Sequence, residues 1–133
     1  HNNSVFALSY TPDFNFLISG SRDARLKIWD TEDYQQTGEV VAHLFAINHI
    51  AFSPSGEYFA TASMDKSIKI WQASEMKLLK VIDKARHAGH GTSVNKLLWL
   101  AHRNQLISAS DDNTISVWDI RIPDSNSSRQ GDS

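Results

Sequence analysis

The chain has 133 residues, 41% of them hydrophobic and 21% charged, which is typical of one globular unit and not of a disordered segment. Thirteen Lys and Arg residues face fifteen Asp and Glu residues, so a net charge of -2 gives no electrostatic reason to expect binding to nucleic acid or an anionic membrane. Cysteine is absent, which excludes disulfides, thiolate zinc sites and cysteine nucleophiles. No apolar run approaches the roughly 20 residues of a membrane helix, and no secretory signal pattern opens the chain, so we expect a cytoplasmic, intracellular location.

Four residue types recur at one spacing, which indicates an internal repeat. Trp29, Trp71 and Trp118 lie 42 and then 47 residues apart. The same two intervals separate three histidines, three serines and three aspartates: His1, His43 and His90; Ser21, Ser63 and Ser110; Asp23, Asp65 and Asp112. Each histidine precedes its tryptophan by 28 residues, so the five extra residues of the second interval must lie in a connecting loop.

Each repeat is predicted to consist of short strands separated by turns. In the second repeat, β-branched and aromatic residues predict strands over 48–52, 58–63 and 67–71, with turn residues between them. A fourth strand is indicated at 77–82 and, in the first repeat, at 38–42. Adjacent apolar residues such as Leu17 and Ile18 fall on opposite faces of a strand, so the sheets must be covered on both sides. Small sheets stacked face to face around an axis satisfy this requirement.

The pattern of His, Ser-x-Asp and Trp occurs three times at nearly the same spacing. By this pattern the chain resembles the WD-repeat (WD40-type) β-propeller family over residues 1 to about 120. The resemblance implies an all-β partial propeller of about three four-stranded antiparallel blades, the last without an evident outer strand. We place the repeats at 1–42, 43–89 and 90–120, and expect residues 121–133 to form a polar, disordered tail. A closed ring commonly has about seven blades and needs about 300 residues, so the chain is either a fragment, which we favour, or a unit whose copies associate.

Histidine, serine and aspartate together also invite a hydrolase interpretation, with serine as nucleophile. A catalytic set is needed once, whereas this one occurs three times, each time with a tryptophan. The resemblance implies instead a structural hydrogen-bond network in each repeat, in which Asp23 accepts from His1 and Ser21 bridges to Trp29, and likewise in the later repeats. Hydroxyl residues also recur two positions earlier, and they leave open which one joins each network: Ser19, Thr61 and Ser108.

Other kinds of chemistry find little support in the sequence. His87, His90 and His102 lie close together, but their spacing does not match compact zinc motifs. The glycines around His90 lack the lysine of a phosphate-binding loop, and strand tryptophans are better explained by burial than by base stacking. We therefore expect no catalytic residue, no metal and no cofactor.

A partner-binding surface is the remaining functional expectation. In the resembled family, exposed positions at the channel mouth lie three and five residues after the histidine and one before the aspartate; carried over, they are Ser4, Phe6, Arg22, Ala46, Asn48, Met64, Ser93, Asn95 and Asp111. Phe, Arg and Met are types enriched at interfaces, although Phe6 could equally pack on a neighbouring blade. The basic loop 84–89 is another candidate contact, or else a solvated loop.

These expectations describe a non-catalytic scaffold that binds a protein or peptide partner, with possible self-association through open blade edges. The alternative is an accessory propeller region of a larger enzyme or regulatory protein, where the blades position a separate catalytic domain.

Overall fold

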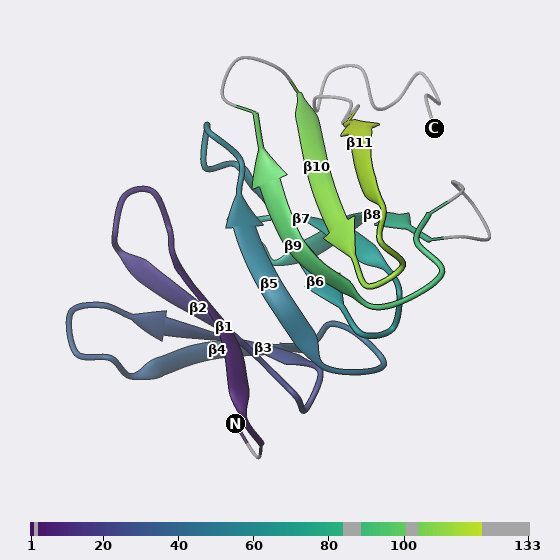
Figure 1. The fold of residues 1–133 in the computed structure, drawn as a ribbon. Helices are drawn as coiled ribbons and strands as arrows, with labels where there is room; N and C mark the ends of the chain where they lie inside the picture. The colour runs from purple at the N-terminus through teal and green to yellow at the C-terminus, as the bar shows by residue number, and fades with distance from the viewer. Residues whose placement is uncertain (2, 84–88, 101–103, 121–133) are drawn as a thin grey trace.

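The computed structural model describes residues 1, 3–83, 89–100 and 104–120. Within these ranges, eleven strands and no helix form three antiparallel sheets (Figure 1). Blade 1 consists of β1 (Val5–Tyr10), β2 (Phe16–Ser21), β3 (Arg25–Asp30) and β4 (Gln36–Val41). Blade 2 consists of β5 (Ile47–Phe52), β6 (Tyr58–Ser63), β7 (Ile68–Gln72) and β8 (Lys77–Ile82). Blade 3 consists of β9 (Val94–Trp99), β10 (Gln105–Ser110) and β11 (Ile115–Asp119).

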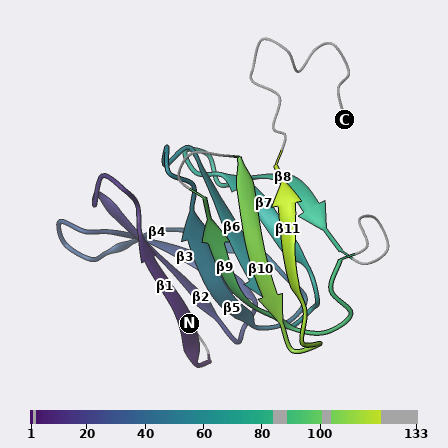
Figure 2. The same ribbon diagram turned by 45° about the horizontal axis from the view of Figure 1, so that its top comes forward.

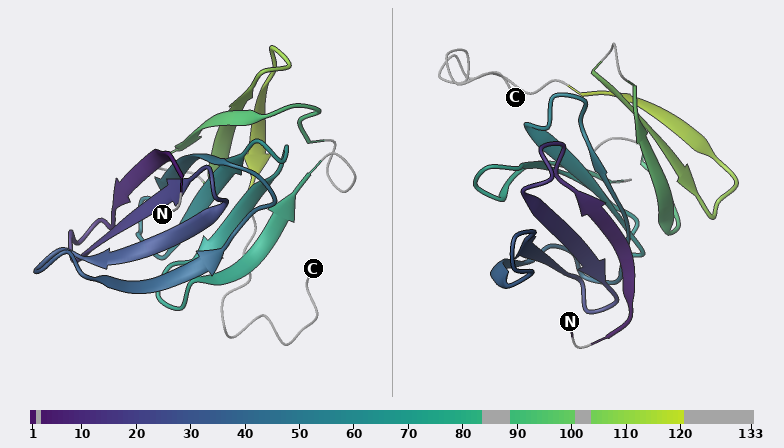
Figure 3. Two further views of the ribbon diagram at one scale, coloured as in Figure 1. Left: turned by 90° about the horizontal axis from the view of Figure 1, so that it is seen from below. Right: turned by 90° about the vertical axis from the view of Figure 1, so that its left-hand side faces the viewer.

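The three blades stand side by side in chain order (Figures 2 and 3). Hydrogen bonding follows sequence order within each sheet, and the first strand of the middle blade, β5, contacts the first strands of both neighbours, β1 and β9. This arrangement confirms the predicted all-β partial propeller. In blade 2 the predicted strands 58–63 and 77–82 match β6 and β8. The predicted strand 48–52 begins one residue later than β5, whereas 67–71 and 38–42 differ from β7 and β4 by one or two residues at both ends.

The turn that carries each recurring aspartate has the same geometry in all three blades. In blade 1, Asp23 Oδ1 accepts a hydrogen bond from the Arg25 amide at 3.0 Å, while Ala24 between them has a φ of 66°. Lys66 and Asn113 take the equivalent left-handed conformation in the other blades, at 75° and 66°. The aspartate side chain thus adds a hydrogen bond to a turn whose left-handed conformation L-residues adopt at some cost.

Blade 2 is covered on both faces, as the adjacent apolar residues of the sequence require. One face gives Phe59 and Trp71 to a core shared with blade 1, where their rings stack with centroids 6.1 Å apart. The other face gives Ala60 and Ile70 to a core shared with blade 3. Alternate residues of the same strands therefore serve two separate cores, which is the packing expected of a propeller blade.

Candidate functional site

The recurring polar residues of blade 2 form a buried relay of hydrogen bonds. Trp71 Nε1 donates to Thr61 Oγ1 at 3.0 Å, and Thr61 Oγ1 lies 2.7 Å from His43 Nε2. The other ring nitrogen, His43 Nδ1, lies 2.8 Å from Asp65 Oδ2. The relay joins β7, β6, the loop before β5 and the turn after β6 into one hydrogen-bonded unit.

The same relay occurs in the other two blades. In blade 1, Ser19 Oγ accepts from Trp29 Nε1 at 2.9 Å and lies 2.6 Å from His1 Nε2, while His1 Nδ1 lies 3.1 Å from Asp23 Oδ2. In blade 3 the corresponding distances, from Trp118 to Ser108, from Ser108 to His90, and from His90 to Asp112, are 2.9, 2.7 and 3.5 Å. His90 Nδ1 also lies 3.0 Å from the Thr114 hydroxyl, so its link to Asp112 is the loosest of the three.

The relay assigns the protons of its histidines. An indole N–H can only donate, so the Thr61 hydroxyl accepts from Trp71 and has its own proton available for His43 Nε2. His43 then donates from Nδ1 to the Asp65 carboxylate. A neutral histidine satisfies every group in this chain of bonds.

The pKa shifts of the relay residues agree with the neutral histidine that the hydrogen bonds require. Desolvation lowers the pKa of His43 below its ordinary value and outweighs the opposite effect of Asp65. Burial alone would raise the pKa of Asp65, but hydrogen bonds from His43 and Ser67 hold it well below its usual range. In blade 3 the Thr114 hydroxyl lowers the pKa of Asp112 to about 2. Near neutral pH the pair in blade 2 is therefore a carboxylate and a neutral imidazole.

The prediction that Ser21 bridges to Trp29 is wrong, because the hydroxyl in that position belongs to another serine. Ser19 contacts the indole, whereas Ser21 Oγ donates to the Ser4 carbonyl at 2.8 Å and accepts from the Asp23 amide at 3.3 Å. Ser63 and Ser110 make the same kind of bond, to the carbonyls of Ala46 and Ser93 at 2.9 and 2.7 Å. These serines tie the turn after the second strand to the start of the first strand and lie outside the tryptophan relay.

Aspartate, histidine and a hydroxyl here follow the order of a catalytic triad, but the hydroxyl is inaccessible. Ser19 is 3% exposed, and Thr61 and Ser108 are fully buried. Each of these hydroxyls also accepts an indole N–H, so no substrate can reach it without opening a blade. The arrangement can hold strands and loops together and cannot attack a substrate.

Within the described ranges, no group of three His, Asp or Glu side chains lies close enough to hold a metal ion. His87 and His102 lie outside the described residues, as do the basic segment 84–88 and the tail 121–133. His90 has Ser108 and Thr114 at its two ring nitrogens. The part of the chain that the structure describes also contains no helix long and apolar enough to cross a membrane.

One end of blades 1 and 2 carries a cluster of exposed apolar side chains. Leu44 and Phe45, in the loop before β5, are 82% and 62% exposed, and Met64, in the turn after β6, is 49% exposed. Together with Arg22 they line a shallow pocket of about 450 Å³. We call these four residues the loop-end surface.

The expected mouth positions divide into exposed and structural residues. Ser4, Phe6, Arg22, Met64 and Asp111 are exposed, and Phe6 retains 49% of its accessible surface, so it does not pack into either core.

Ala46 differs from this expectation because it is only 2% exposed, although it lines the shallow pocket beside Leu44, Phe45 and Met64. Asn48 donates to the Val94 carbonyl at 2.9 Å and thereby links blades 2 and 3. Asn95 donates to Asp111 at 2.5 Å, and Ser93 is half-buried beside it.

Leu44 and Phe45 were not among the residues expected from the sequence, although it contains a signal for them. At the two positions after the histidine the other repeats carry Asn2 and Asn3, or Gly91 and Thr92. Two large apolar residues in a loop where the other repeats have small or polar ones are the sequence signal that distinguishes this loop from its counterparts.

Comparison with known proteins identifies the repeats. The family model "WD domain, G-beta repeat" (WD40) matches residues 1–30, 34–72 and 80–119. Nuclear distribution protein nudF 1 of Talaromyces marneffei is 33% identical over 123 residues, an alignment that covers 90% of this chain and 26% of that protein. The guanine nucleotide-binding protein subunit beta of Zea mays is 26% identical, over 90% of this chain and 32% of that protein. The chain thus spans about a quarter to a third of the length of these relatives.

Solved structures agree with this result. The structure of U3-55K and the crystal structure of the RRP9 WD40 repeats both superpose with a TM-score of 0.83 at 26% identity. They cover 90% of this chain, which corresponds to 37% and 36% of theirs. From the family match, the three hydrogen-bonded relays and the stacked blades, we conclude that the chain belongs to the WD40 repeat family.

Proposed function

We propose that the chain is a non-catalytic scaffold that binds a protein or peptide partner through the loop-end surface. The observation that carries this proposal is the exposure of Leu44, Phe45 and Met64 beside one another. Exposed apolar groups gathered on one rigid surface are typical of protein interaction sites, because they are removed from water only when a partner covers them.

The scaffold beneath the surface supports the same proposal. Met64 donates its amide to the Ala46 carbonyl at 3.0 Å, and the Leu44 amide donates to Asp65 Oδ2 at 3.1 Å. The relay of blade 2 therefore fixes both loops on which the apolar side chains stand. A preorganised surface loses little conformational entropy when a partner binds.

Arg22 gives the surface its chemical preference. Its side chain is exposed, and among the described residues no carboxylate forms an ion pair with it. A partner segment with an apolar anchor and a nearby carboxylate would use both kinds of group. The net charge of -2 favours a protein partner over nucleic acid or an anionic membrane. We also place the protein in the cytoplasm, because a chain without cysteine needs no oxidising environment.

Selection of a displayed random peptide library on the full chain tests this function. Selected peptides should bind the chain carrying Leu44→Ser and Phe45→Ser at least tenfold more weakly than the unchanged chain. Leu78→Ser is the matched control, because Leu78 is 40% exposed on β8 and lies outside the loop-end surface. Peptides that bind the double variant as tightly as the unchanged chain would contradict the proposal.

A further inference from the structure

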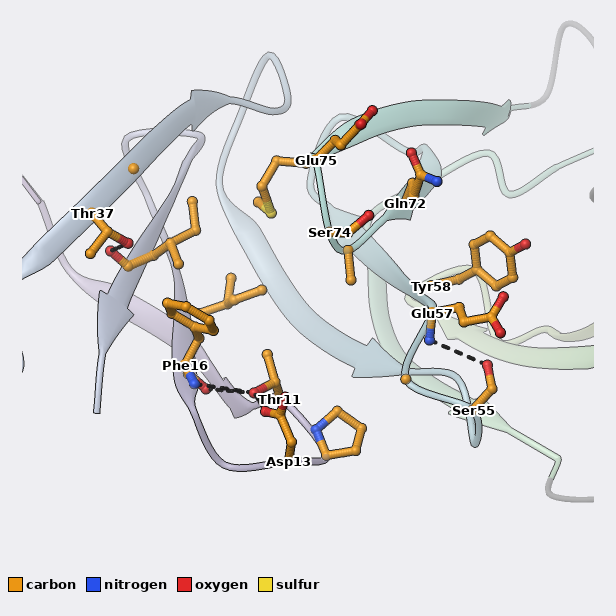
Figure 4. A pocket seen from close by; sticks show the side chains of 17 residues that line it. Thr11, Asp13, Phe16, Thr37, Ser55, Glu57, Tyr58, Gln72, Ser74 and Glu75 are labelled. Carbon is orange, nitrogen blue, oxygen red and sulfur yellow. Dashed lines mark hydrogen bonds between the residues drawn. The ribbon is translucent and has the colours of Figure 1, made fainter. Parts of the chain in front are cut away.

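A second hollow lies between blades 1 and 2, away from the loop-end surface. It has a volume of about 980 Å³, at the upper end of the range for ligand-binding pockets. Figure 4 shows its two walls: Thr11, Asp13, Phe16 and Thr37 on blade 1, and Ser55, Glu57, Ser74 and Glu75 on blade 2. We call this hollow the inter-blade groove.

The inter-blade groove has apolar surface on both sides. Ile18, Ile28 and Phe16 come from blade 1, and Met76 comes from the turn that precedes β8. Ile18 is almost fully buried in the core between the blades, whereas Phe16 keeps 39% of its surface exposed. The groove therefore extends from the edge of the core to solvent, as a site for an inserted apolar side chain requires.

Two glycines shape the groove. Gly38 leaves space beside one wall, and Gly56 lets the two blades approach closely at one end. A Cβ on Gly38 of β4 would lie 3.0 Å from the Ile28 side chain, so a side chain here would compete with Ile28 for the space beside the groove. Gly56, at a φ of 78°, brings the turn of blade 2 against Pro12 of blade 1, where a Cβ would lie 3.0 Å from Pro12 Cγ. All described lining residues belong to blades 1 and 2, so the packing of these two blades is sufficient to form the groove.

The charge on the groove has one sign. Asp13, Glu57 and Glu75 line it, and none of its described lining residues is Lys or Arg. Asp13 Oδ1 accepts bonds from the Thr11 hydroxyl at 2.6 Å and the Asn15 amide at 2.9 Å, and these bonds lower its pKa, so this carboxylate stays ionised. An apolar groove with acidic walls complements a basic segment that carries an apolar side chain.

We propose that the inter-blade groove binds an extended, basic segment of a protein partner, with one apolar side chain inserted beside Ile28 and Met76 and with lysine or arginine side chains paired to Glu57 and Glu75. This site goes beyond the proposed function, because it lies on a different surface and selects the opposite charge from Arg22 at the loop-end surface.

Fluorescence anisotropy with the full chain tests the proposal. The probe is a labelled peptide in which lysines flank a single leucine, and the comparison peptide has glutamates in place of the lysines. The basic peptide should bind with a Kd below about 1 mM, and the acidic peptide should not bind in that range. Glu57→Gln combined with Glu75→Gln should weaken binding about five- to tenfold.

Two controls separate the groove from total charge and from the loop-end surface. Glu32→Gln combined with Asp119→Asn changes the net charge equally but lies outside the groove, and Phe45→Ser alters only the loop-end surface; both should leave the affinity unchanged. Ser74→Trp, at an exposed turn position on the groove wall, should block binding. Equal binding of the two peptides, no binding of the basic one, or equal losses in the groove and charge-control variants would overturn the proposal.

Discussion

His43 and Asp65 are joined by a bond of 2.8 Å between Nδ1 and Oδ2, although 22 residues separate them in sequence. Asp65 also accepts from the Leu44 amide and from the amide and hydroxyl of Ser67. One carboxylate thus satisfies four donors in two loops, and these loops carry the three apolar residues of the loop-end surface, Leu44, Phe45 and Met64.

Replacing this carboxylate should destabilise the fold. Asp65→Ala leaves buried donors unsatisfied, so we expect the free energy of unfolding to fall by about 2–4 kcal/mol. Urea unfolding followed by circular dichroism measures the change, with Glu32→Ala as the control because Glu32 is exposed at a turn. If the two variants unfold at the same urea concentration, the relay does not stabilise the blade.

A sharper prediction concerns Thr61, whose hydroxyl is the central group of the relay in blade 2. Thr61→Val keeps the shape but leaves Trp71 Nε1 and His43 Nε2 without a partner, at an expected cost of about 2–3 kcal/mol. Thr61→Ser keeps the hydroxyl, as Ser19 does in blade 1, and should cost only about 1 kcal/mol for the buried methyl group. Equal losses in the same unfolding measurement would show that packing alone matters at this position.

The period of the repeat predicted the blades and their strands, because it fixes which positions must be apolar on both faces. The choice between Ser19 and Ser21 did not follow from the period, since residues two apart on a strand share a face. Strand register decides it: Leu17 pairs with Trp29 across β2 and β3, so Ser19 is two residues from that pair and Ser21 is four, about 13 Å along the strand. The inter-blade groove lay beyond prediction because it depends on how far two whole sheets diverge.

Acid should weaken the fold in two steps. The pKa values of His43 and His49 are lowered by burial, so the unfolded chain binds protons more readily than the folded chain, and stability falls as pH drops below about 6.5. The lowered pKa of Asp65 adds a second loss below about pH 4, where the unfolded carboxyl takes up a proton first. Stability should therefore be greatest near neutral pH.

Urea midpoints measured between pH 7.5 and pH 3 check this dependence. His49 Nδ1 accepts the Leu97 amide of the neighbouring blade at 2.8 Å, which only an unprotonated nitrogen can do. In His49→Gln, an amide oxygen can accept this bond without titrating, so the slope between pH 7 and pH 5 should become shallower. A midpoint that stays constant from pH 7.5 to pH 5 would contradict the assignment of neutral histidines.

Self-association should depend on the open face of blade 3. Leu98, Ile107 and Val117 lie opposite one another across β9, β10 and β11, and Leu98 and Val117 are 59% and 58% exposed. The corresponding residues of blade 1 include Ile18, which is 2% exposed because blade 2 covers it. Blade 3 therefore presents to solvent the kind of face that elsewhere in the chain is covered by the next blade.

A charge placed on this face should oppose association. Light scattering over a concentration series should give a mass above 14.9 kDa for the unchanged chain and a mass close to that value for Val117→Lys. Leu78→Lys adds the same charge on β8, where Leu78 is 40% exposed, and should not lower the mass. If Val117→Lys and the unchanged chain associate equally, the contact between copies lies elsewhere, because a lysine ammonium cannot be buried in an apolar interface without a large desolvation cost.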